Sequence, residues 1–330
     1  MLLGVRDDLR QGALRFRLSG EGPFLAEPDS GIPVLTDLPA LLDSAARVAR
    51  DTADHEDLKR LLPAGSSLGG ARPKVHVLTA AGRVAIAKFP SPGSDTWNVM
   101  AWEKVALDLA RDAGLIVARA ELIQVGDRHV LIVERFDRRD GDRVGYASAK
   151  TMLQAGYDDQ RSYLEIAAVL EERSTAATAD LRQLWRRIAF SVLISNTDDH
   201  LRNHGFLQEH GESWTLSPAF DLNPDPEAPK HLKTAIDYTD TRASVDTLMT
   251  VADHFRLDAS SALNVLAEVT RVVANWRRVA VSHGLAQREL DLMAPAFEHA
   301  AGDQARALTA SRGVRSGGTL SDAGSMAADQ

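Results

Sequence analysis

The most informative stretch of this chain is Asn196-Thr197-Asp198-Asp199-His200-Leu201-Arg202-Asn203. Asp221 follows 18 residues after Asn203, in Ala219-Phe220-Asp221-Leu222. Phosphoryl transfer needs one carboxylate that takes or orients the proton of the acceptor hydroxyl. It also needs an amide and a second carboxylate that hold magnesium against the triphosphate. The stretch and Asp221 supply these groups in chain order.

An Asp followed after four residues by an Asn is the spacing of a protein-kinase catalytic loop, and Phe220-Asp221 is similar to the metal-binding Asp motif of these enzymes. Taken alone, the spacing is equally compatible with a solvated turn. The context favours a catalytic loop. Apolar residues spaced as on one helix face over 181–193 lead to Asp198, and a short strand at 214–216 leads to Asp221.

Composition excludes several classes of protein. The chain has 330 residues, of which 44% are hydrophobic, so two lobes with a sizeable core are expected. The net charge of -8 argues against a general polyanion binder but leaves room for a local basic patch. The absence of cysteine excludes disulfides and thiolate metal sites. No signal peptide and no apolar run of membrane length is evident, so a cytoplasmic protein without membrane contact is expected.

Hydrophobic patterning predicts a strand-rich first half and a helix-rich second half, the order of an α+β, two-lobed fold. Residues 63–74 form a connection rich in Ser, Gly and Pro, and Asp140-Gly141-Asp142 marks a turn. Two or three helices are expected over 244–300. The other expected elements are strands at 13–18, 75–78, 84–89 and 129–136, and helices at 39–50 (capped by Asp37) and 98–113 (ended by Gly114).

Lys88 and Glu103 are the next candidates for a nucleotide site. Lys88 lies in the apolar strand Ile86-Ala87-Lys88-Phe89, which is similar to the kinase V-A-I-K strand. A kinase pairs such a Lys with a Glu of the following helix, where Glu103 stands. The alternatives are a Lys on the solvated face of its strand and a surface Glu paired with Lys104 or Arg111.

The loop from Ser66 to Lys74 precedes these strands. Gly69 and Gly70 let the backbone approach a phosphate closely, and Ser67 and Lys74 can add polar contacts. The loop matches neither G-x-x-x-x-G-K-[ST] nor G-x-G-x-x-G, and by itself it is more typical of a flexible linker.

Two other chemistries are weakly indicated. His200, His204 and His210 raise the question of a zinc site, but there is no H-E-x-x-H pattern and structural zinc usually takes four ligands. A His-assisted hydrolase lacks its G-x-S-x-G elbow.

Together these motifs resemble the HipA-like serine/threonine kinases, toxins of bacterial toxin–antitoxin modules. The resemblance runs over most of residues 5–300. It rests on the S-x-x-G-x-x-x-K loop Ser67–Lys74, the strand Ala87-Lys88-Phe89-Pro90, the helix from Trp102-Glu103 to Gly114-Leu115, the hinge strand Val133–Arg138, the N-x-D-x-H-x-x-N loop Asn196–Asn203, and Phe220-Asp221.

The resemblance implies a two-lobed protein-kinase-like fold that uses ATP and Mg²⁺. It implies a strand-rich first lobe at 61–140, an all-helical second lobe at 141–300, part of an N-terminal subdomain at 1–60, and a disordered tail at 301–330. Asp198 would be the catalytic base, Asn203 and Asp221 would hold magnesium, and Glu103 would support Lys88. The nucleotide would contact Gly69, Gly70, Ala71, Arg72, Pro73, Lys74, Lys88, the backbone of Glu134 and Phe136, His200, Asn203 and Asp221.

Family members inactivate themselves by phosphorylating the loop serine. Ser67 is the matching position, and Ser66 is adjacent to it. A phosphoserine carries nearly two negative charges and cannot share a site with the phosphates of ATP, so the loop must move out.

The resemblance also implies partners and a substrate. The substrate would be a protein, with an aminoacyl-tRNA synthetase expected, and the partner would be an antitoxin of the HipB type. DNA would be contacted only through that antitoxin, because no helix-turn-helix with a basic face is evident. The chain looks like the short, HipT-type kinases, in which a small separate protein supplies the missing N-terminal subdomain. Arg72 stands where the family usually has Gln.

Two rival functions stay open at this point. A small-molecule phosphotransferase of kinase-like architecture would use the same Asp198 and Asn203, although Ser66 and Ser67 favour a protein kinase. The second rival is a non-catalytic component of an antitoxin–DNA complex. Such a protein would not need the complete set of Lys88, Asp198, Asn203 and Asp221.

Overall fold

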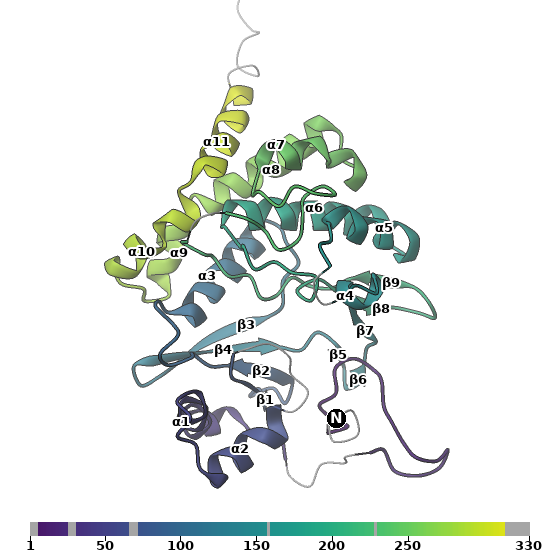
Figure 1. Ribbon diagram of the computed structural model, residues 1–330, viewed down its shortest axis with the longest axis vertical. Helices are drawn as coiled ribbons and strands as arrows, with labels where there is room; N and C mark the ends of the chain where they lie inside the picture. Colours follow the sequence, from purple (N-terminus) through teal and green to yellow (C-terminus); the bar gives the residue numbers. More distant parts are fainter. Residues whose placement is uncertain (1–5, 26–30, 66–71, 157–158, 228–229, 314–330) are drawn as a thin grey trace, which may run out of the picture.

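The computed structural model describes residues 6–25, 31–65, 72–156, 159–227 and 230–313. Its first lobe is built on one antiparallel sheet with the strand order β1-β2-β4-β3 (Figure 1). The predicted strands at 75–78, 84–89 and 129–136 correspond to β1, β2 and β4, whereas β3 was not predicted. The bounds are β1 Lys74–Leu78, β2 Val84–Lys88, β3 Ala120–Val125 and β4 Arg128–Glu134.

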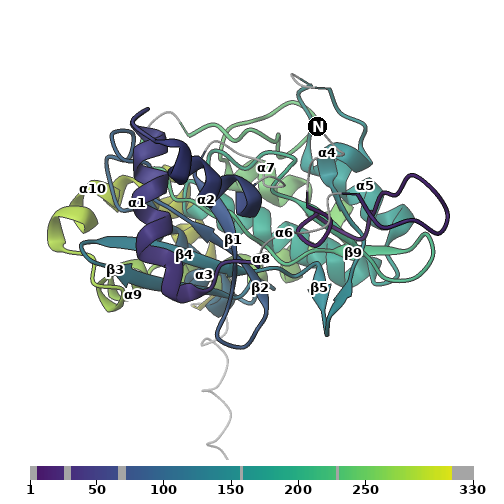
Figure 2. The ribbon, with the colours of Figure 1, turned by 90° about the horizontal axis from the view of Figure 1, so that it is seen from below.

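Two helices cover one face of this sheet, as the view from below shows (Figure 2). They are α1 (Leu38–Ala49), which follows the short 3₁₀ turn η2 (Leu35–Asp37) and was predicted, and α2 (His55–Gly65), which was not. Leu38 and Leu41 of α1 pack with Val75, Ala87 and Ile132 in a small core of their own. This core holds α1 and α2 against the face of the sheet that points away from the second lobe.

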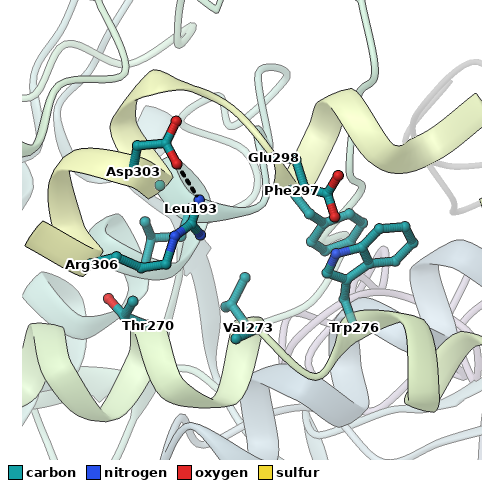
Figure 3. Close-up of a pocket in the computed structure, with 10 residues that line it drawn as sticks. Leu193, Thr270, Val273, Trp276, Phe297, Glu298, Asp303 and Arg306 are labelled. Atoms are coloured by element: carbon teal, nitrogen blue, oxygen red, sulfur yellow. Dashed lines mark hydrogen bonds and ion pairs between the residues drawn. The ribbon is translucent and has the colours of Figure 1, made fainter. Parts of the chain in front are cut away.

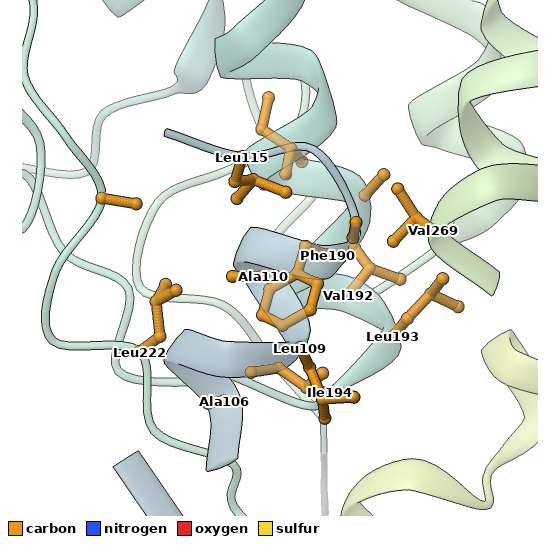
Figure 4. Packing of buried hydrophobic residues seen from close by; sticks show 14 of the residues in the cluster. Ala106, Leu109, Ala110, Leu115, Phe190, Val192, Leu193, Ile194, Leu222 and Val269 are labelled. Carbon is orange, nitrogen blue, oxygen red and sulfur yellow. The ribbon is translucent and has the colours of Figure 1, made fainter. Parts of the chain in front are cut away.

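The helix α3 (Val99–Asp112) covers the opposite face. Asn98 caps it by accepting a hydrogen bond from the N–H of Ala101, and Gly114 ends it with a φ of 80°, as the sequence predicts. Its other side packs into the helical lobe, where Leu109 and Ala110 share a core with Phe190 of α6 (Ala177–Leu193; Figure 4). One buried helix therefore joins the two lobes.

The second lobe is mainly helical, but it is not all-helical as predicted. A hairpin, β5 (Arg138–Arg139) and β6 (Asp142–Arg143), forms at the predicted turn, and a three-stranded sheet follows with the order β7-β8-β9. Its strands are β7 Tyr146–Ser148, β8 Gly205–Gln208 and β9 Trp214–Leu216. Only β9 was predicted, because β7 and β8 pair with each other across a long stretch of sequence, which a local pattern does not reveal.

The helices of this lobe pack around the long, buried α6. The predicted helix at 181–193 is the main part of α6, and residues 244–300 contain more helices than the two or three predicted. The predicted disorder of 301–330 is wrong for residues 301–313, which belong to α11. The bounds are α4 Ala149–Met152, α5 Tyr163–Arg173, α6 Ala177–Leu193, α7 Val245–Thr250, η3 Ala252–Phe255, α8 Ala259–Val273, α9 Trp276–Ser282, α10 Gln287–Phe297 and α11 Ala300–Gly313.

Residues 6–15, the N-terminal segment, do not form the strand predicted from the alternation over 13–18. Arg17 forms only an isolated bridge with Phe24. Instead, backbone carbonyls of the segment accept hydrogen bonds from the guanidinium groups of Arg135, Arg138 and Arg143. The segment is fastened by distant arginines rather than by strand pairing, and a local pattern cannot reveal that.

Candidate active site

Lys88 stands at the centre of a cluster of charges from three elements. Its Nζ lies 2.6 Å from Oε1 of Glu103 on α3 and 2.8 Å from Oδ1 of Asp221, in the segment after β9. Lys88 and Glu103 are 9% and 2% exposed, so neither is the surface side chain that the alternative interpretations required. Lys104 and Arg111 pair with Asp108 instead. The structure brings three of the predicted residues into direct contact.

The pKa values of the cluster follow from burial and mutual charge. Burial by itself would lower the pKa of Lys88, but Asp221 and Glu103 outweigh it, and the net pKa is raised. The pKa of Asp221 is lowered to about 2, chiefly by the charge of Lys88. Burial raises the pKa of Glu103 against the opposing effect of Lys88. Lys88 is therefore a fixed cation at neutral pH.

Lys74 adds a second cation to this site. It is paired in register with Lys88 across β1 and β2. Burial lowers its pKa, and the charge of Lys88 lowers it further, while Asp221 and Glu103 act in the opposite direction. Two ammonium groups beside each other in a buried site are suited to binding polyphosphate.

The loop 196–203 leaves α6 through Ser195, which has a φ of 53°. The N–H of His200 donates to the carbonyl oxygen of Asp198 at 2.9 Å, and the side-chain amide of Asn203 donates to the same oxygen at 3.3 Å. The side chain of Asp198 is exposed, whereas Asn203 is buried. The amide nitrogen of Asn203 is thus engaged within the loop, and its oxygen is the atom suited to a cation.

Asp199 anchors this loop, a role that the sequence did not predict. Its carboxylate accepts hydrogen bonds from the hydroxyls of Tyr163 at 2.6 Å and Ser191 at 3.1 Å, and lies 2.9 Å from Nε2 of His204. Its carbonyl oxygen accepts a hydrogen bond from Thr234 at 2.7 Å. Burial would raise the pKa of Asp199, but His204, Tyr163 and the charge of Arg187 outweigh it, and the net pKa is lowered. The charged carboxylate of Asp199, the residue after Asp198, therefore holds the loop in shape.

Asn223 is a second residue that sequence reasoning missed. Its N–H donates to Oδ1 of Asn196 at 3.1 Å, and its side-chain amide donates to Oδ1 of Asp221 at 3.4 Å. Asp221 itself has a φ of 58°. The available signal was its position two residues after Asp221 in a Phe-Asp motif. Asn223 links the loop 196–203 to the predicted metal-binding carboxylate.

The residues present fit a magnesium–nucleotide ligand. Nδ1 of His200 and Oδ1 of Asn223 are buried and make no hydrogen bond in the structure, which is costly unless a ligand or water meets them. The carboxylate of Asp221 and the amide oxygen of Asn203 are ligand types that Mg²⁺ accepts, with phosphate oxygens and water supplying the rest. In the described parts of the chain, no three or more His, Cys, Asp or Glu side chains form a metal site of their own.

The predicted adenine contacts lie at the end of β4. The N–H of Glu134 donates to the carbonyl oxygen of Arg119 at 2.8 Å, so an adenine contact of Glu134 could involve only its carbonyl oxygen. The ring of Phe136 lies 5.5 Å from that of Phe220 and 6.1 Å from that of Tyr146. Phe136 thereby connects the hinge strand to the Phe-Asp motif.

Only the end of the predicted phosphate loop is described. Arg72 forms an ion pair with Asp95 at 2.6 Å, and the carbonyl oxygen of Pro73 accepts a hydrogen bond from Phe89 at 3.0 Å. Ser66, Ser67, Gly69, Gly70 and Ala71 lie outside the described residues. Among the described helices, none has both the length and the apolar character needed to cross a bilayer.

Comparison with known families gives this site a context. A family model described as the HipA-like C-terminal domain matches residues 66–276, a range that spans Lys88, Glu103, Asp198, Asn203 and Asp221. The chain belongs to the HipA-like C-terminal domain family. The predicted resemblance to HipA-like proteins is therefore confirmed.

One curated relative of this HipA-like chain is "Putative kinase Y4dM" of Sinorhizobium fredii, which is 30% identical over 135 residues. That match covers 36% of this chain and 32% of the relative, so it spans only about a third of either protein.

Two solved structures share the fold. HipA of Shewanella oneidensis MR-1, from a complex of HipA, HipB and operator DNA, has a TM-score of 0.58 and 17% identity, over 87% of this chain and 75% of that chain. The proinflammatory kinase CtkA of Helicobacter pylori has a TM-score of 0.54 and 14% identity, over 75% of this chain and 94% of that chain. The α+β, two-lobed, kinase-like fold predicted for this HipA-like chain is confirmed.

Proposed function

We propose that this chain is an ATP- and magnesium-dependent serine/threonine protein kinase that acts as the toxin of a bacterial toxin–antitoxin system. The observation that carries the proposal is the position of Lys88, whose ammonium group is held by Glu103 at 2.6 Å and lies 2.8 Å from Asp221. Protein kinases require a strand Lys paired with a helix Glu and placed beside a metal-binding Asp.

Each residue has a distinct part in this proposal. Asp198, exposed at the tip of its loop, orients the acceptor hydroxyl and takes its proton. Lys88 and Lys74 bind and orient phosphate oxygens, and His200 offers its unpaired Nδ1 in the same site. Asn203 and Asp221 would hold magnesium, which neutralises charge on the transferred phosphoryl group when bound. Asp199 keeps the loop in shape for Asp198.

The proposal includes self-inactivation and an antitoxin. Ser67, or Ser66 beside it, would be the autophosphorylated serine, because the matching loop precedes Lys74 and the paired strands. A HipB-type antitoxin is the expected partner, since the Shewanella oneidensis HipA of similar fold was solved with HipB and operator DNA. The substrate would be a protein, with an aminoacyl-tRNA synthetase as the first candidate.

Intact-mass spectrometry tests the proposal most directly. The protein expressed alone and incubated with ATP and Mg²⁺ is expected to gain one phosphate on Ser67 or Ser66, while Asp198→Asn gains none. Glu212→Gln, at an exposed turn of the helical lobe, is the matched control and should behave as the wild type. Unmodified wild-type protein under these conditions would contradict the protein-kinase proposal.

A second measurement identifies the substrate. The wild type and Asp198→Asn are incubated with labelled ATP and cell lysate, and the proteins labelled only by the wild type are identified. We expect a protein of the translation machinery. If the wild type consumes ATP without labelling any protein, the small-molecule phosphotransferase is the correct function instead.

A further inference from the structure

A cavity of about 350 Å³ lies in the helical lobe, and its lining residues are separate from the candidate active site (Figure 3). Its walls come from the C-terminal ends of α6 and α8, the start of α9, the end of α10, and α11. A volume of this size is at the lower end of that of small-molecule sites.

One side of the cavity is apolar and closely packed. The rings of Trp276 and Phe297 are stacked with centroids 4.7 Å apart and planes within 8° of parallel. Both side chains are at most 3% exposed. Leu193 and Val273 complete this apolar lining. The wall suits a flat or branched apolar group of a few carbon atoms.

The other side is open to solvent and charged with both signs, because the side chains of Arg306, Asp303 and Glu298 are 46%, 75% and 47% exposed. Arg306 forms an ion pair with Asp303 across from the two rings (Figure 3). Glu298 also lines the cavity, and it is held by Arg277. A ligand with only a negative charge would face the carboxylates of Asp303 and Glu298, and one with only a positive charge would face Arg306. A zwitterion with an apolar body meets both requirements.

We infer that this cavity binds a free α-amino acid with a large apolar side chain. The ligand carboxylate pairs with the guanidinium of Arg306, which can take it in a bidentate manner. The ligand ammonium pairs with Asp303, and the apolar side chain packs against Trp276 and Phe297.

The cavity adjoins residues that lie close in sequence to Glu103 and to the loop 196–203. Trp102 packs against the wall, with ring centroids 5.9 Å from Trp276 and 6.0 Å from Phe297, and it directly precedes Glu103. Leu193 is the last residue of α6 and lies three positions before Asn196. A bound ligand would therefore touch Leu193 and the two rings on which Trp102 packs.

This connection gives the ligand a regulatory role, which rests on the proposed kinase function. Because Trp102 packs on the cavity wall and directly precedes Glu103, a ligand that binds only when these rings are packed would favour the Lys88–Glu103 pair. The paired state is the one that binds nucleotide. Amino acid and nucleotide are thus expected to strengthen each other's binding by the same factor, as linkage requires.

Isothermal titration calorimetry without nucleotide tests the site itself. Saturable binding is expected for L-phenylalanine or L-leucine, and not for 3-phenylpropanoate or 2-phenylethylamine, each of which lacks one of the two charges. Arg306→Gln should weaken binding at least about tenfold, since a charged hydrogen-bond partner is lost. Arg288→Gln, an exposed arginine on α10, is the control and should bind as the wild type. Thermal unfolding confirms that both variants fold.

Three outcomes would overturn the inference: no saturable binding of either amino acid, equal binding of a singly charged analogue, or wild-type affinity of Arg306→Gln. A protein without kinase activity can still pass this test, because the titration contains no nucleotide. The coupling between amino-acid binding and nucleotide binding is tested separately, by titrating Mg²⁺–ADP with and without the amino acid. About fivefold tighter nucleotide binding is expected, and unchanged affinity would refute the regulatory role.

Discussion

Nζ of Lys88 lies 2.8 Å from Oδ1 of Asp221, although the two residues are 133 positions apart. The ion pair joins the last residue of β2 to the segment that follows β9. Glu103 of α3 shares the same ammonium group. Because one lysine balances two carboxylates, the charge state of each group depends on the other two.

Replacing Lys88 with Met removes the ammonium group that pairs directly with Glu103 and Asp221. We expect a loss of about 3 kcal/mol in the free energy of unfolding, because a buried carboxylate remains unpaired, together with the loss of nucleotide binding. The double variant Lys88→Met/Glu103→Leu should recover most of the stability but none of the binding. Urea unfolding and ADP titration measure these two effects. Equal stability of the single and double variants would show that Glu103 does not depend on Lys88.

The same ion pair predicts how stability varies with pH. The pKa of Asp221 is lowered to about 2, below its unfolded value of about 3.9. The contribution of ionised Asp221 to the free energy of unfolding is therefore complete above about pH 4 and is lost as the pH falls through about 2. The raised pKa of Lys88 keeps its contribution complete up to about pH 10, the unfolded value.

Urea unfolding of the wild type and Asp221→Asn over a range of pH checks the direction of this pH dependence. The difference in the free energy of unfolding between the two proteins should be constant from about pH 4 to about pH 10 and should shrink under acid conditions. A difference that persists unchanged at pH 2 would mean that the ion pair does not set the pKa of Asp221.

Asp199→Asn tests whether the buried anchor positions Asp198. The variant loses the charge that lies 2.9 Å from His204 and weakens the bond from Tyr163. We expect kcat to fall about tenfold or more, because a charged hydrogen-bonding group is removed, while ADP affinity is nearly unchanged. Tyr163→Phe should have a smaller effect in the same direction. Wild-type kcat in a folded Asp199→Asn protein would assign Asp199 a structural role only.

Arg135→Met should release the N-terminal segment. Arg135 donates hydrogen bonds to Asp137 and to the carbonyl oxygens of Leu9 at 2.8 Å and Arg10 at 2.9 Å. Its loss is expected to lower the free energy of unfolding by about 2 kcal/mol and to speed hydrogen exchange over residues 6–12. Arg139→Met is the matched control, because its side chain is 58% exposed. Equal exchange in the two variants would show that other groups hold the segment.

The strongly periodic parts of the sequence predicted their elements correctly. The strands at 75–78 and 84–89 and the helices at 98–113 and 181–193 were predicted because one face of each is buried against a core. The strand β3 was missed because its exposed Glu121 and polar Gln124 weaken the apolar signal. The N-terminal segment was misassigned because alternation over 13–18 looked like a strand.

The candidate site was predictable where a residue type and a spacing imply a chemistry. Lys88, Glu103 and Asp221 were proposed from such patterns, and the structure brings them together. Asp199 and Asn223 could not be proposed in this way, since their roles depend on partners such as Tyr163 and Asn196 that only tertiary structure brings near.

The attachment of the N-terminal segment through its main chain has a consequence for sequence variation. The guanidinium groups of Arg135, Arg138 and Arg143 donate hydrogen bonds to backbone carbonyl oxygens of the segment. Every amino acid provides a backbone carbonyl oxygen. Side chains there that make no other contact are free to change without loss of the attachment. The exception is Gly12, where an added Cβ would lie 3.0 Å from the backbone nitrogen of Tyr146. Homologues are therefore expected to keep the three arginines and this glycine while the exposed positions of the segment diverge.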